Sequence, residues 1–270
     1  MKLGLYVNDG NKLSVSTAEE FIALIEKQNI KHVDIKRVDE KCDLIVVFGG
    51  DGTTVRVINY AVKYDIPAIV INTGTMGFFS DFKSNELEEA LNAIKSGCYC
   101  TERTLLNVEC NGVSAMALND VVIKRKSDEE STVVKLKVSI NDQFVDEYYA
   151  DGLIFSTPTG STAYALSAGG SVIAPDSEVF SLTPICAHSF NSRSIVYNDK
   201  SIVKVTKKPE SKAVVFVDGN KMFEMSDAPI TISKSFSRFK LCLIKNEFFK
   251  RLKIKLSRVD IWTKLKDKNY

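Results

Sequence analysis

Glycines and a single carboxylate follow an all-apolar run early in this 270-residue chain. Residues 44–48 lead directly into Gly49-Gly50-Asp51-Gly52-Thr53. Glycines after a buried strand let the backbone approach a ligand closely, and amide groups at the start of the next helix favour negative charge. A carboxylate among such amides repels a phosphate, unless a cation bridges the two or the carboxylate accepts a proton during reaction. Both roles belong to phosphoryl transfer, so Asp51 is the candidate catalytic residue.

The same segment has a plainer interpretation, a tight strand-to-helix turn in which Asp51 caps the helix. Two better-known phosphate motifs are absent from the sequence. No Gly-x-x-x-x-Gly-Lys-Ser/Thr occurs, and Val55 stands where a dinucleotide fingerprint requires glycine or alanine. Neither a P-loop nor the usual Rossmann cofactor site is therefore predicted.

A second polar segment lies far downstream. Asp151-Gly152 precedes the apolar residues 153–155, which lead into Ser156 and a stretch of hydroxyls and glycines that ends at Tyr164. Hydroxyls and amides can bind a purine edge and a ribose, and Tyr164 offers a face for stacking. A polar loop rich in turn-forming residues is the alternative. That alternative does not explain why the segment follows a buried strand, so the pattern favours a nucleotide site.

A polar pair, Asn119-Asp120, interrupts an apolar run over residues 115–123. If buried, these groups need partners, and an amide beside a carboxylate suits ribose hydroxyls and base nitrogens. A β-turn or bulge explains the pair equally well when it is taken alone. Asn72-Thr73-Gly74 similarly ends an apolar segment, and open α/β sheets bind ligands where their strands end.

The first part of the chain alternates short apolar strands with helical stretches. Strands are predicted at residues 2–7, 32–37, 44–48 and 68–72. One helix is predicted to begin at Thr17, with Glu20 completing a capping box, and another to run from about Glu86 to Lys95 and stop at Gly97. The pattern predicts an α/β N-terminal domain over residues 1–98, with a Rossmann-like parallel sheet.

The pattern changes to alternation after residue 98. Val134, Leu136 and Val138 face one way, lysines face the other, and Asn141-Asp142 forms a turn. Residues 99–245 are therefore predicted to form a mainly antiparallel, all-β C-terminal domain. The segment 246–270 becomes helical again and is expected to pack back on the first domain. Its predicted contact residues are Phe248, Phe249, Leu252, Ile254 and Leu256.

Composition limits the function classes. The chain is 44% hydrophobic and 26% charged, with a net charge of +2 and both signs interspersed. This argues against a nucleic-acid groove and against a membrane surface. No segment has the length of a signal-peptide core or a membrane span, so a cytoplasmic location is expected. Six scattered cysteines and two histidines predict no zinc site, and the thiols are interpreted as small core residues.

Together, these motifs resemble the NAD kinases. The matching residues are Gly49-Gly50-Asp51-Gly52-Thr53, Asn72-Thr73-Gly74 with Gly77-Phe78, Asn119-Asp120, the block from Asp151 to Gly170, His188 with Arg193, and Val217-Asp218-Gly219. The resemblance covers about residues 1–256, and the block after Asp151 is its most specific part. Gly-Gly-Asp-Gly alone also resembles lipid kinases of the diacylglycerol kinase type and phosphofructokinases.

The resemblance implies an enzyme that transfers a phosphoryl group from ATP to the 2′-hydroxyl of the adenosine ribose of NAD, giving NADP. It implies a divalent cation, usually Mg²⁺, carried by the ATP phosphates, and no protein ligand is assigned to that metal. Asp51 matches the family's proposed general base. The phosphate-binding and ATP-binding positions are Gly49, Gly50, Gly52 and Thr53. The NAD-binding positions are Gly52, Phe78, Asn119, Asp120, Asp151, Thr159, Thr162, Ala163, Tyr164, Ser167 and His188.

Specific roles also follow from the resemblance. Asn119 and Asp120 match positions that hold the adenosine of NAD, and the adenine pocket is matched by Phe78, Thr162, Ala163 and Tyr164. Asp151 matches a residue that family members often supply across a subunit boundary to the nicotinamide end, and His188 is placed at the same boundary. A homodimer or homotetramer is therefore expected.

Other functions compete with this one. A lipid kinase would phosphorylate a membrane alcohol, but the hydroxyl-rich residues 157–164 suit a nucleotide better than an acyl chain. A sensor without catalysis would need no carboxylate at Asp51. Tyr149 and Asn220 stand where relatives often carry arginine and glutamine. The resemblance therefore leaves both NAD and NADH open as the acceptor.

Overall fold

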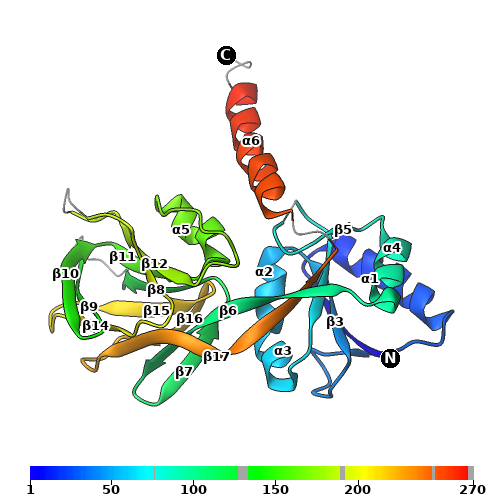
Figure 1. Cartoon of the computed structure of the whole chain (residues 1–270), viewed down its shortest axis with the longest axis horizontal. Coiled ribbons are helices and arrows are strands. Elements are labelled where there is room, and N and C mark those ends of the chain that lie inside the picture. The colour runs from blue at the N-terminus through cyan, green and yellow to red at the C-terminus, as the bar shows by residue number, and fades with distance from the viewer. Residues whose placement is uncertain (76, 127–132, 189–191, 245–246, 267–270) are drawn as a thin grey trace. The chain divides into compact units, whose positions relative to one another are not determined.

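The computed structural model describes residues 1–75, 77–126, 133–188, 192–244 and 247–266, with side chains to residue 257 in the last range. The chain divides into two compact units, residues 1–102 with 239–270, and residues 103–238 (Figure 1). Two strands, β6 (Tyr99–Cys110) and β17 (Ile230–Leu243), continue from one unit into the other. The sequence placed the domain boundaries at 98/99 and 245/246, close to the ends of these strands, because the residue pattern changes there.

The first unit is a parallel sheet with helices. Its elements are β1 (Lys2–Val7), α1 (Lys12–Glu26), β2 (Lys31–Asp34), β3 (Leu44–Gly49), α2 (Asp51–Thr54), η1 (Val55–Val57), α3 (Ile58–Tyr64), β4 (Ala68–Asn72), β5 (Phe82–Lys83), α4 (Leu87–Ser96) and α6 (Phe248–Lys266). Strands β2, β1, β3 and β4 lie side by side in that order, all parallel, and β5 extends β4 in parallel. All six residues of β3 are buried, as expected for a parallel strand covered on both faces.

The helix α1 begins earlier than the sequence predicted. Asn11 is its N-cap, and the Asn11 side chain accepts hydrogen bonds from the backbone N–H groups of Leu13 (2.9 Å) and Ser14 (3.4 Å). Thr17 is buried inside the helix, so the predicted start at Thr17 is wrong. A hydroxyl followed three residues later by Glu occurs within helices as well as at their starts. The prediction of α4 is confirmed, and Gly97 follows it at φ +85°.

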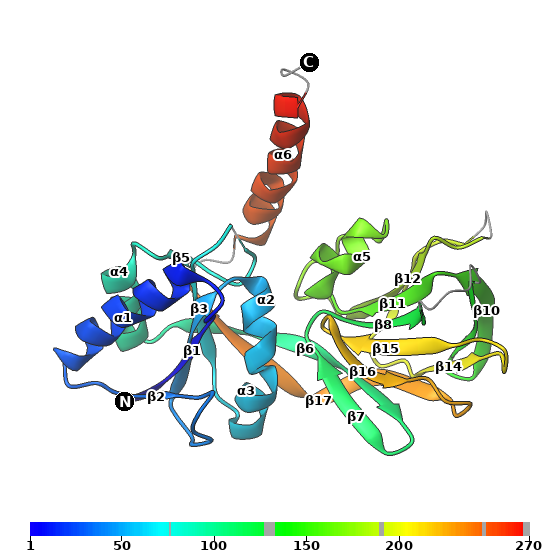
Figure 2. The same cartoon turned by 180° about the vertical axis from the view of Figure 1, so that it is seen from behind.

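The second unit contains two antiparallel sheets (Figure 2). Its remaining elements are β7 (Val113–Ala117), β8 (Asp120–Arg125), β9 (Val134–Ile140), β10 (Gln143–Ala150), β11 (Gly152–Ser156), η2 (Gly160–Thr162), α5 (Tyr164–Ser167), β12 (Val179–Ile185), β13 (Ile195–Asn198), β14 (Val203–Lys207), β15 (Ala213–Val217) and β16 (Asn220–Glu224). One sheet has the order β13-β12-β11-β8-β15-β16. In the other, β10, β9, β14 and β17 lie in that order, β6 pairs with β17 and β7, and β17 also pairs with β4 of the first unit, so that this sheet has eleven strands among the described residues. Leu136, Phe155 and Val205 belong to one hydrophobic core that both sheets share.

The hairpin of β9 and β10 follows the predicted alternation. Val134, Leu136 and Val138 are buried, and the turn residues Asn141 and Asp142 have φ values of 51° and 61°. Two consecutive left-handed residues are the signature of a two-residue hairpin turn. The predicted fold class, a parallel α/β domain followed by a mainly antiparallel β domain, is confirmed.

Two cysteines, Cys42 and Cys110, are buried free thiols as predicted, and three others differ from that prediction. Cys100 of β6 and Cys242 of β17 form a disulfide across 142 residues of sequence, and Cys186 is exposed. The pairing of β6 with β17 brings Cys100 and Cys242 together. Strand pairing of this kind is not visible in the spacing of cysteines along the chain.

The C-terminal helix α6 makes some of the predicted contacts and not others. Residues 246 and 267–270 of the predicted segment lie outside the described residues. Phe249 is 70% exposed and Leu256 is 46% exposed, so both are wrong as contact residues. The predicted contact of Phe248 is confirmed, because the centre of its ring lies 5.7 Å from that of Phe78. Leu252 and Ile254 are partly buried, and the buried Arg251 was not predicted. Within the described residues no helix is long and apolar enough to cross a membrane.

Candidate active site

A cavity of about 370 Å³ lies beside Asp51 in the first unit, and we call it the Asp51 cavity. The strand β3 ends at Gly49, Gly50 is the N-cap of α2, and Asp51 is the first residue of that helix. The cavity is lined by Asn8, Asn11, Gly50, Asp51, Gly52, Thr73, Gly74, Thr75, Gly77 and Lys255. Ends of parallel strands thus surround the carboxylate, where open α/β sheets bind their ligands.

Backbone donors hold the Asp51 carboxylate. The N–H of Phe78 lies 3.0 Å from both carboxylate oxygens, and the N–H of Phe79 lies 3.2 Å from Oδ1. The ammonium of Lys255 lies 3.4 Å from Oδ2. A Cβ at Gly77 would collide with Oδ1, so this close approach requires glycine. The carboxylate is therefore oriented by the residues 77–79 and not by its own helix.

The glycines after β3 have two different environments. A Cβ at Gly50 or Gly52 would meet no atom within 4 Å, so the backbone there is open to a ligand. Gly49 is buried against the Thr53 side chain, which would collide with any Cβ at Gly49. Of the four predicted phosphate-binding residues, Gly50 and Gly52 line the Asp51 cavity. Gly49 and Thr53 are buried and are not among its lining residues.

Several residues that line this cavity or support it were not predicted as site residues. Asn11 caps α1 and also donates from Nδ2 to the carbonyl oxygen of Thr73 (3.4 Å). The Thr73 hydroxyl lies 2.6 Å from the hydroxyl of Ser14 and is buried with it. Lys255 comes from a helix about two hundred residues downstream. No local pattern indicated Lys255. The strand end at Asn72-Thr73-Gly74 did predict a ligand site there, and Thr73 and Gly74 line the cavity.

The second unit places Asn119 and Asp120 where β8 begins, beside the end of β11. Asp120 pairs in register with Ser156, and the N–H of Thr157 donates to the carbonyl oxygen of Asn119 (2.9 Å). A third carboxylate, Asp218, accepts hydrogen bonds from the N–H groups of Leu118 (2.8 Å), Asn119 (2.7 Å) and Asp120 (3.1 Å). The predicted polar pair is therefore held in place through its backbone N–H groups, and the Asp120 residue is buried.

The turn after β11 is built against the same backbone. The Thr157 hydroxyl donates to the carbonyl oxygen of Leu118, and it accepts from the N–H of Gly160 (3.0 Å). The Ser161 hydroxyl donates to the carbonyl oxygen of Pro158 (2.7 Å) and accepts from the N–H of Ile173 (2.9 Å). Several hydroxyls of the block therefore satisfy buried backbone groups, which is a structural role that the sequence did not separate from ligand binding.

Burial changes the acidity of Asp120. Its side chain is 5% exposed, and burial together with the nearby Asp218 carboxylate raises the pKa of Asp120 to about 7, although Lys124 opposes the shift. Burial also raises the pKa of Asp218, against its three backbone donors. An aspartate in an unfolded chain titrates near pH 3.9. Near neutral pH, Asp120 therefore exchanges a proton that an ordinary aspartate has already lost.

This shift predicts a pH-dependent stability. Between about pH 4 and 7 the folded state keeps a proton on Asp120 that the unfolded chain releases, so the free energy of unfolding falls as pH rises through that window. Asp120→Asn removes the titration and should gain roughly 2–4 kcal/mol relative to the wild type between pH 5 and pH 8. Urea unfolding at both pH values measures this difference.

The matched control for that experiment is Asp142→Asn, because the Asp142 side chain is 80% exposed and pairs with Lys204 at the surface. This control should keep the pH dependence of the wild type. Equal pH dependence in Asp120→Asn and wild type would contradict the raised pKa of Asp120.

A second cavity, of about 580 Å³, brings Asp151 and Tyr164 together in the second unit. Its charged and aromatic lining includes Lys124, whose ammonium lies 4.5 Å from the centre of the Tyr164 ring. Arg125 Nε lies 3.1 Å from Asp151 Oδ1. Thr159 is buried, and Thr162 and Ala163 are partly buried in the turn leading to α5. Ser167 and His188 are exposed and are not among the described residues that line this cavity.

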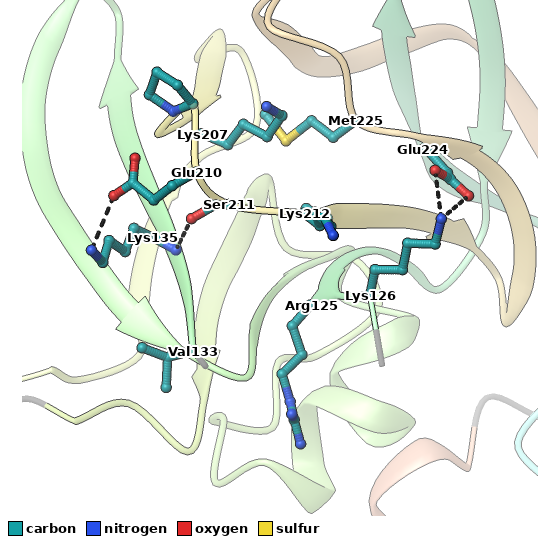
Figure 3. A pocket seen from close by; sticks show the side chains of 12 residues that line it. Arg125, Lys126, Val133, Lys135, Lys207, Glu210, Ser211, Lys212, Glu224 and Met225 are labelled. Carbon is teal, nitrogen blue, oxygen red and sulfur yellow. Dashed lines mark hydrogen bonds and ion pairs between the residues drawn. The ribbon is translucent and has the colours of Figure 1, made fainter. Parts of the chain in front are cut away.

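Another cavity in the second unit, of about 540 Å³, contains none of the predicted site residues (Figure 3). Its lysines and acids face one another. Lys135 pairs with Glu210 (3.0 Å) and Lys126 pairs with Glu224 (2.9 Å). These pairs satisfy charge at the surface. Among the residues that the structure describes, no group of three or more His, Cys, Asp or Glu side chains could hold a metal ion.

A parallel α/β unit with one oriented carboxylate at a glycine-lined cavity has the features of a phosphotransferase. Comparison with known proteins agrees with this class. The model of the ATP-NAD kinase N-terminal domain matches residues 3–99, and that of the ATP-NAD kinase C-terminal domain matches residues 118–244. The chain therefore belongs to the ATP-NAD kinase family, and it is an enzyme of the transferase class.

Individual relatives support the same assignment. An NAD kinase of Clostridium botulinum (strain Kyoto / Type A2) is 33% identical over 272 residues, which cover 94% of this chain and 96% of the relative. An NAD kinase of Sulfurimonas denitrificans is 36% identical over 212 residues, covering 75% and 74%.

Two solved structures share the fold. An Archaeoglobus fulgidus NAD kinase in complex with ATP has a TM-score of 0.77 at 26% identity, covering 96% of this chain and 99% of the other. Yeast NADH kinase complexed with NADH has a TM-score of 0.84 at 21% identity, covering 95% and 87%.

Proposed function

We propose that this chain phosphorylates the 2′-hydroxyl of the adenosine ribose of NAD with ATP as donor, giving NADP, and that Asp51 is the general base. The observation that carries the proposal is the placement of Asp51. Its carboxylate lines a cavity with the open backbone of Gly50 and Gly52 and is oriented by the N–H groups of Phe78 and Phe79. A turn that merely capped a helix would not need a carboxylate held from a second loop. The Archaeoglobus fulgidus relative that binds ATP supports the choice of donor.

The proposed reaction is a single displacement at the γ-phosphorus. The 2′-hydroxyl oxygen forms a bond to the γ-phosphorus while the bond to the bridging oxygen breaks, and the electron pair of that bond stays on ADP. The hydroxyl proton passes to Asp51, which is 25% exposed and so can return it to solvent. Gly50 and Gly52 let the phosphates approach the backbone.

A divalent cation that is bound to the phosphates of the nucleotide fits this chemistry. Mg²⁺ is usually bound through one or two carboxylates plus substrate phosphates, and Asp51 is the one carboxylate among the described residues that line the cavity. When bound, the cation would neutralise charge on the transferred phosphoryl group.

The second unit would hold NAD. Asn119 and Asp120 would bind the adenosine, with Thr162, Ala163 and Tyr164 around the adenine, and Asp151 would face the nicotinamide end. The proposed NAD-binding set is completed by Gly52, Phe78, Thr159, Ser167 and His188. The cavity that contains Asp151 and Tyr164 supports this placement. Family resemblance supports a cytoplasmic homodimer or homotetramer, in which Asp151 would serve the neighbouring subunit.

The test is formation of NADP by the purified full chain with magnesium, ATP and NAD, measured through an NADP-specific dehydrogenase. NADP that appears only when ATP and NAD are both present supports the proposal. If no NADP forms while calorimetry still detects NAD binding, the chain uses another phosphoryl donor or acts as a sensor, and the proposal as stated fails.

A further inference from the structure

The helix α6 delivers a cation to the proposed catalytic carboxylate. Lys255 Nζ lies 3.4 Å from Asp51 Oδ2 and 4.3 Å from the centre of the Phe78 ring. Among the described residues that line the Asp51 cavity, Lys255 is the only lysine or arginine. Its side chain is 41% exposed, so the ammonium reaches both the carboxylate and the open cavity. Among the described lining residues, Lys255 is thus the one cationic side chain available to a phosphate in the Asp51 cavity, and lysine has a flexible four-carbon stem.

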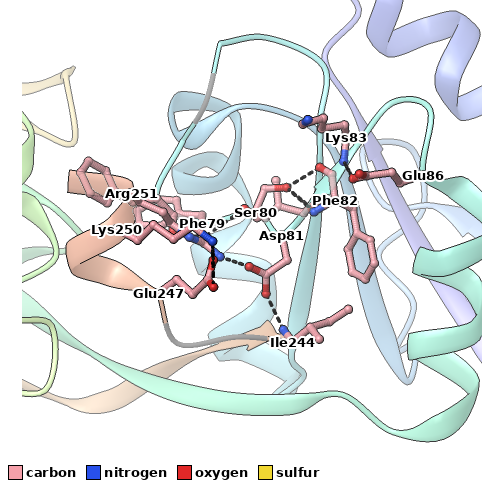
Figure 4. Close-up of polar contacts among 12 residues, drawn as sticks. Phe79, Ser80, Asp81, Phe82, Lys83, Glu86, Ile244, Glu247, Lys250 and Arg251 are labelled. Carbon is pink, nitrogen blue, oxygen red and sulfur yellow. Dashed lines mark hydrogen bonds and ion pairs between the residues drawn. The ribbon is translucent and has the colours of Figure 1, made fainter. Parts of the chain in front are cut away.

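Buried contacts one turn earlier hold the helix in place (Figure 4). The Arg251 guanidinium donates to the carbonyl oxygens of Phe78 (3.0 Å) and Ser80 (2.9 Å), and it forms an ion pair with Asp81. Asp81 also accepts from the N–H of Ile244. The Arg251 side chain is 9% exposed, and its guanidinium contacts oxygens of Phe78, Ser80 and Asp81, so it is a rigid anchor. The anchor attaches α6 to the loop that orients Asp51.

The spacing along α6 makes this arrangement specific. Phe248, Arg251 and Lys255 are three and then four residues apart, so they share one helix face. Phe248 packs on the Phe78 ring, and Arg251 binds the carbonyl oxygens of Phe78 and Ser80. Lys255 contacts the Asp51 carboxylate that the N–H groups of Phe78 and Phe79 orient. The position of Lys255 is therefore set by two anchored neighbours.

The ion pair between Lys255 and Asp51 conflicts with the proposed role of Asp51 as general base. A general base needs a free lone pair toward the hydroxyl proton, yet both oxygens accept from Phe78 and Lys255 takes a further site on Oδ2. A triphosphate carries several negative charges, so it attracts the Lys255 ammonium more strongly than a single carboxylate does. The ammonium can exchange partners by rotating its flexible stem, without movement of α6.

We propose that Lys255 is a substrate-contacting residue that pairs with Asp51 before the phosphoryl donor binds and moves to the donor phosphates afterwards. The step exchanges one ionic partner of Lys255 for another, so no covalent bond forms or breaks in it. The exchange frees Asp51 for the acceptor hydroxyl only when the donor is present. This role rests on the proposed kinase function, but its test below measures binding and does not need turnover.

The first test compares three full-length variants by calorimetry with inorganic tripolyphosphate and with ATP. Lys255→Met should weaken binding of both roughly tenfold to a hundredfold, because a charged hydrogen bond to phosphate is lost. Lys255→Arg keeps the charge and should stay within about threefold of the wild type. Lys253→Met is the matched control, since Lys253 is exposed on the same helix and is not among the residues that line the cavity.

A double-mutant cycle tests the exchange itself. Asp51→Asn removes a negative charge and also releases Lys255, so it should tighten tripolyphosphate binding several-fold. In the Lys255→Met background the same change should tighten binding less, because no ammonium remains to be released. Thermal unfolding of each variant separates a binding effect from a folding effect.

Several outcomes would overturn the proposal. Wild-type affinity in Lys255→Met, equal weakening in Lys255→Arg and Lys255→Met, or strict additivity in the cycle would each remove Lys255 from the phosphate site. If Lys255→Met lowers the thermal midpoint, all titrations are made at a temperature well below that midpoint, where every variant is folded. Failure of the wild type to form NADP would overturn the kinase proposal and leave these binding results standing.

Discussion

Asp51→Asn should lower the turnover number for NADP formation roughly a hundredfold to ten-thousandfold, which is the usual contribution of a positioned general base. Asparagine keeps an oxygen that can accept from the Phe78 and Phe79 N–H groups, so the loop should stay in place. Asparagine cannot accept the hydroxyl proton. The affinity for NAD, measured by calorimetry, should therefore change little while the turnover number falls.

Asp65→Asn provides the control for this change. Asp65 has φ 53°, a conformation that asparagine also adopts, and its 78% exposed side chain pairs with Lys240 at the surface. That control should retain wild-type turnover, because an exposed ion pair contributes at most about 1 kcal/mol. Near-normal turnover in Asp51→Asn, with the control unchanged, would show that Asp51 is not the base.

Gly160→Ala should disrupt the proposed adenosine site. A Cβ at Gly160 would overlap the carbonyl group of Asn119 and lie 2.6 Å from its Cα. Backbone cannot move aside as a flexible side chain can, so the turn after β11 and the residues before β8 must separate. We expect a loss of about 2–3 kcal/mol in the free energy of unfolding, the upper range for overpacking. Because the Asn119 backbone moves, the affinity for NAD should fall at least about tenfold.

Urea unfolding and calorimetry with NAD measure the two parts of this effect. Gly10→Ala is the control, since Gly10 is exposed and its Cβ would come no closer than 3.6 Å to another atom. Unchanged stability and unchanged NAD affinity in Gly160→Ala would mean that the turn can relax. The contact between Gly160 and Asn119 would then have no role in positioning the site.

The segment after β3 and the segment after β11 differ in how far their roles could be predicted from sequence. Gly50 and Gly52 are open to a ligand, as glycines after a buried strand predict, and β3 ends where the apolar run ends. Thr157 and Ser161 were interpreted by type as possible ligand contacts, but their hydroxyls bind buried backbone groups. A hydroxyl has the same appearance in sequence whichever partner it finds, so only coordinates separate the two uses.

Helix ends show the same limit. Gly97 stops α4 because glycine adopts the left-handed conformation without a steric penalty, and that preference is local. The start of α1 was misplaced because Asn11 and Thr17 are both acceptable caps by residue type. The choice depends on burial, since Thr17 packs inside the unit while Asn11 also binds the carbonyl oxygen of Thr73.

The sequence by itself determined the alternation of strands and helices in the first unit, the hairpin at Asn141-Asp142 and the carboxylate after β3, because burial patterns and turn preferences act over a few residues. Only the tertiary structure decided which distant groups meet. Lys255 reaches Asp51 across 204 residues, and Asp218 reaches the N–H of Asn119 across 99. Such contacts depend on the path of the whole chain, and a charged residue carries no local sign of its partner. The residue types of the site can therefore be predicted from short segments of sequence, whereas the charges that surround each residue depend on the whole fold.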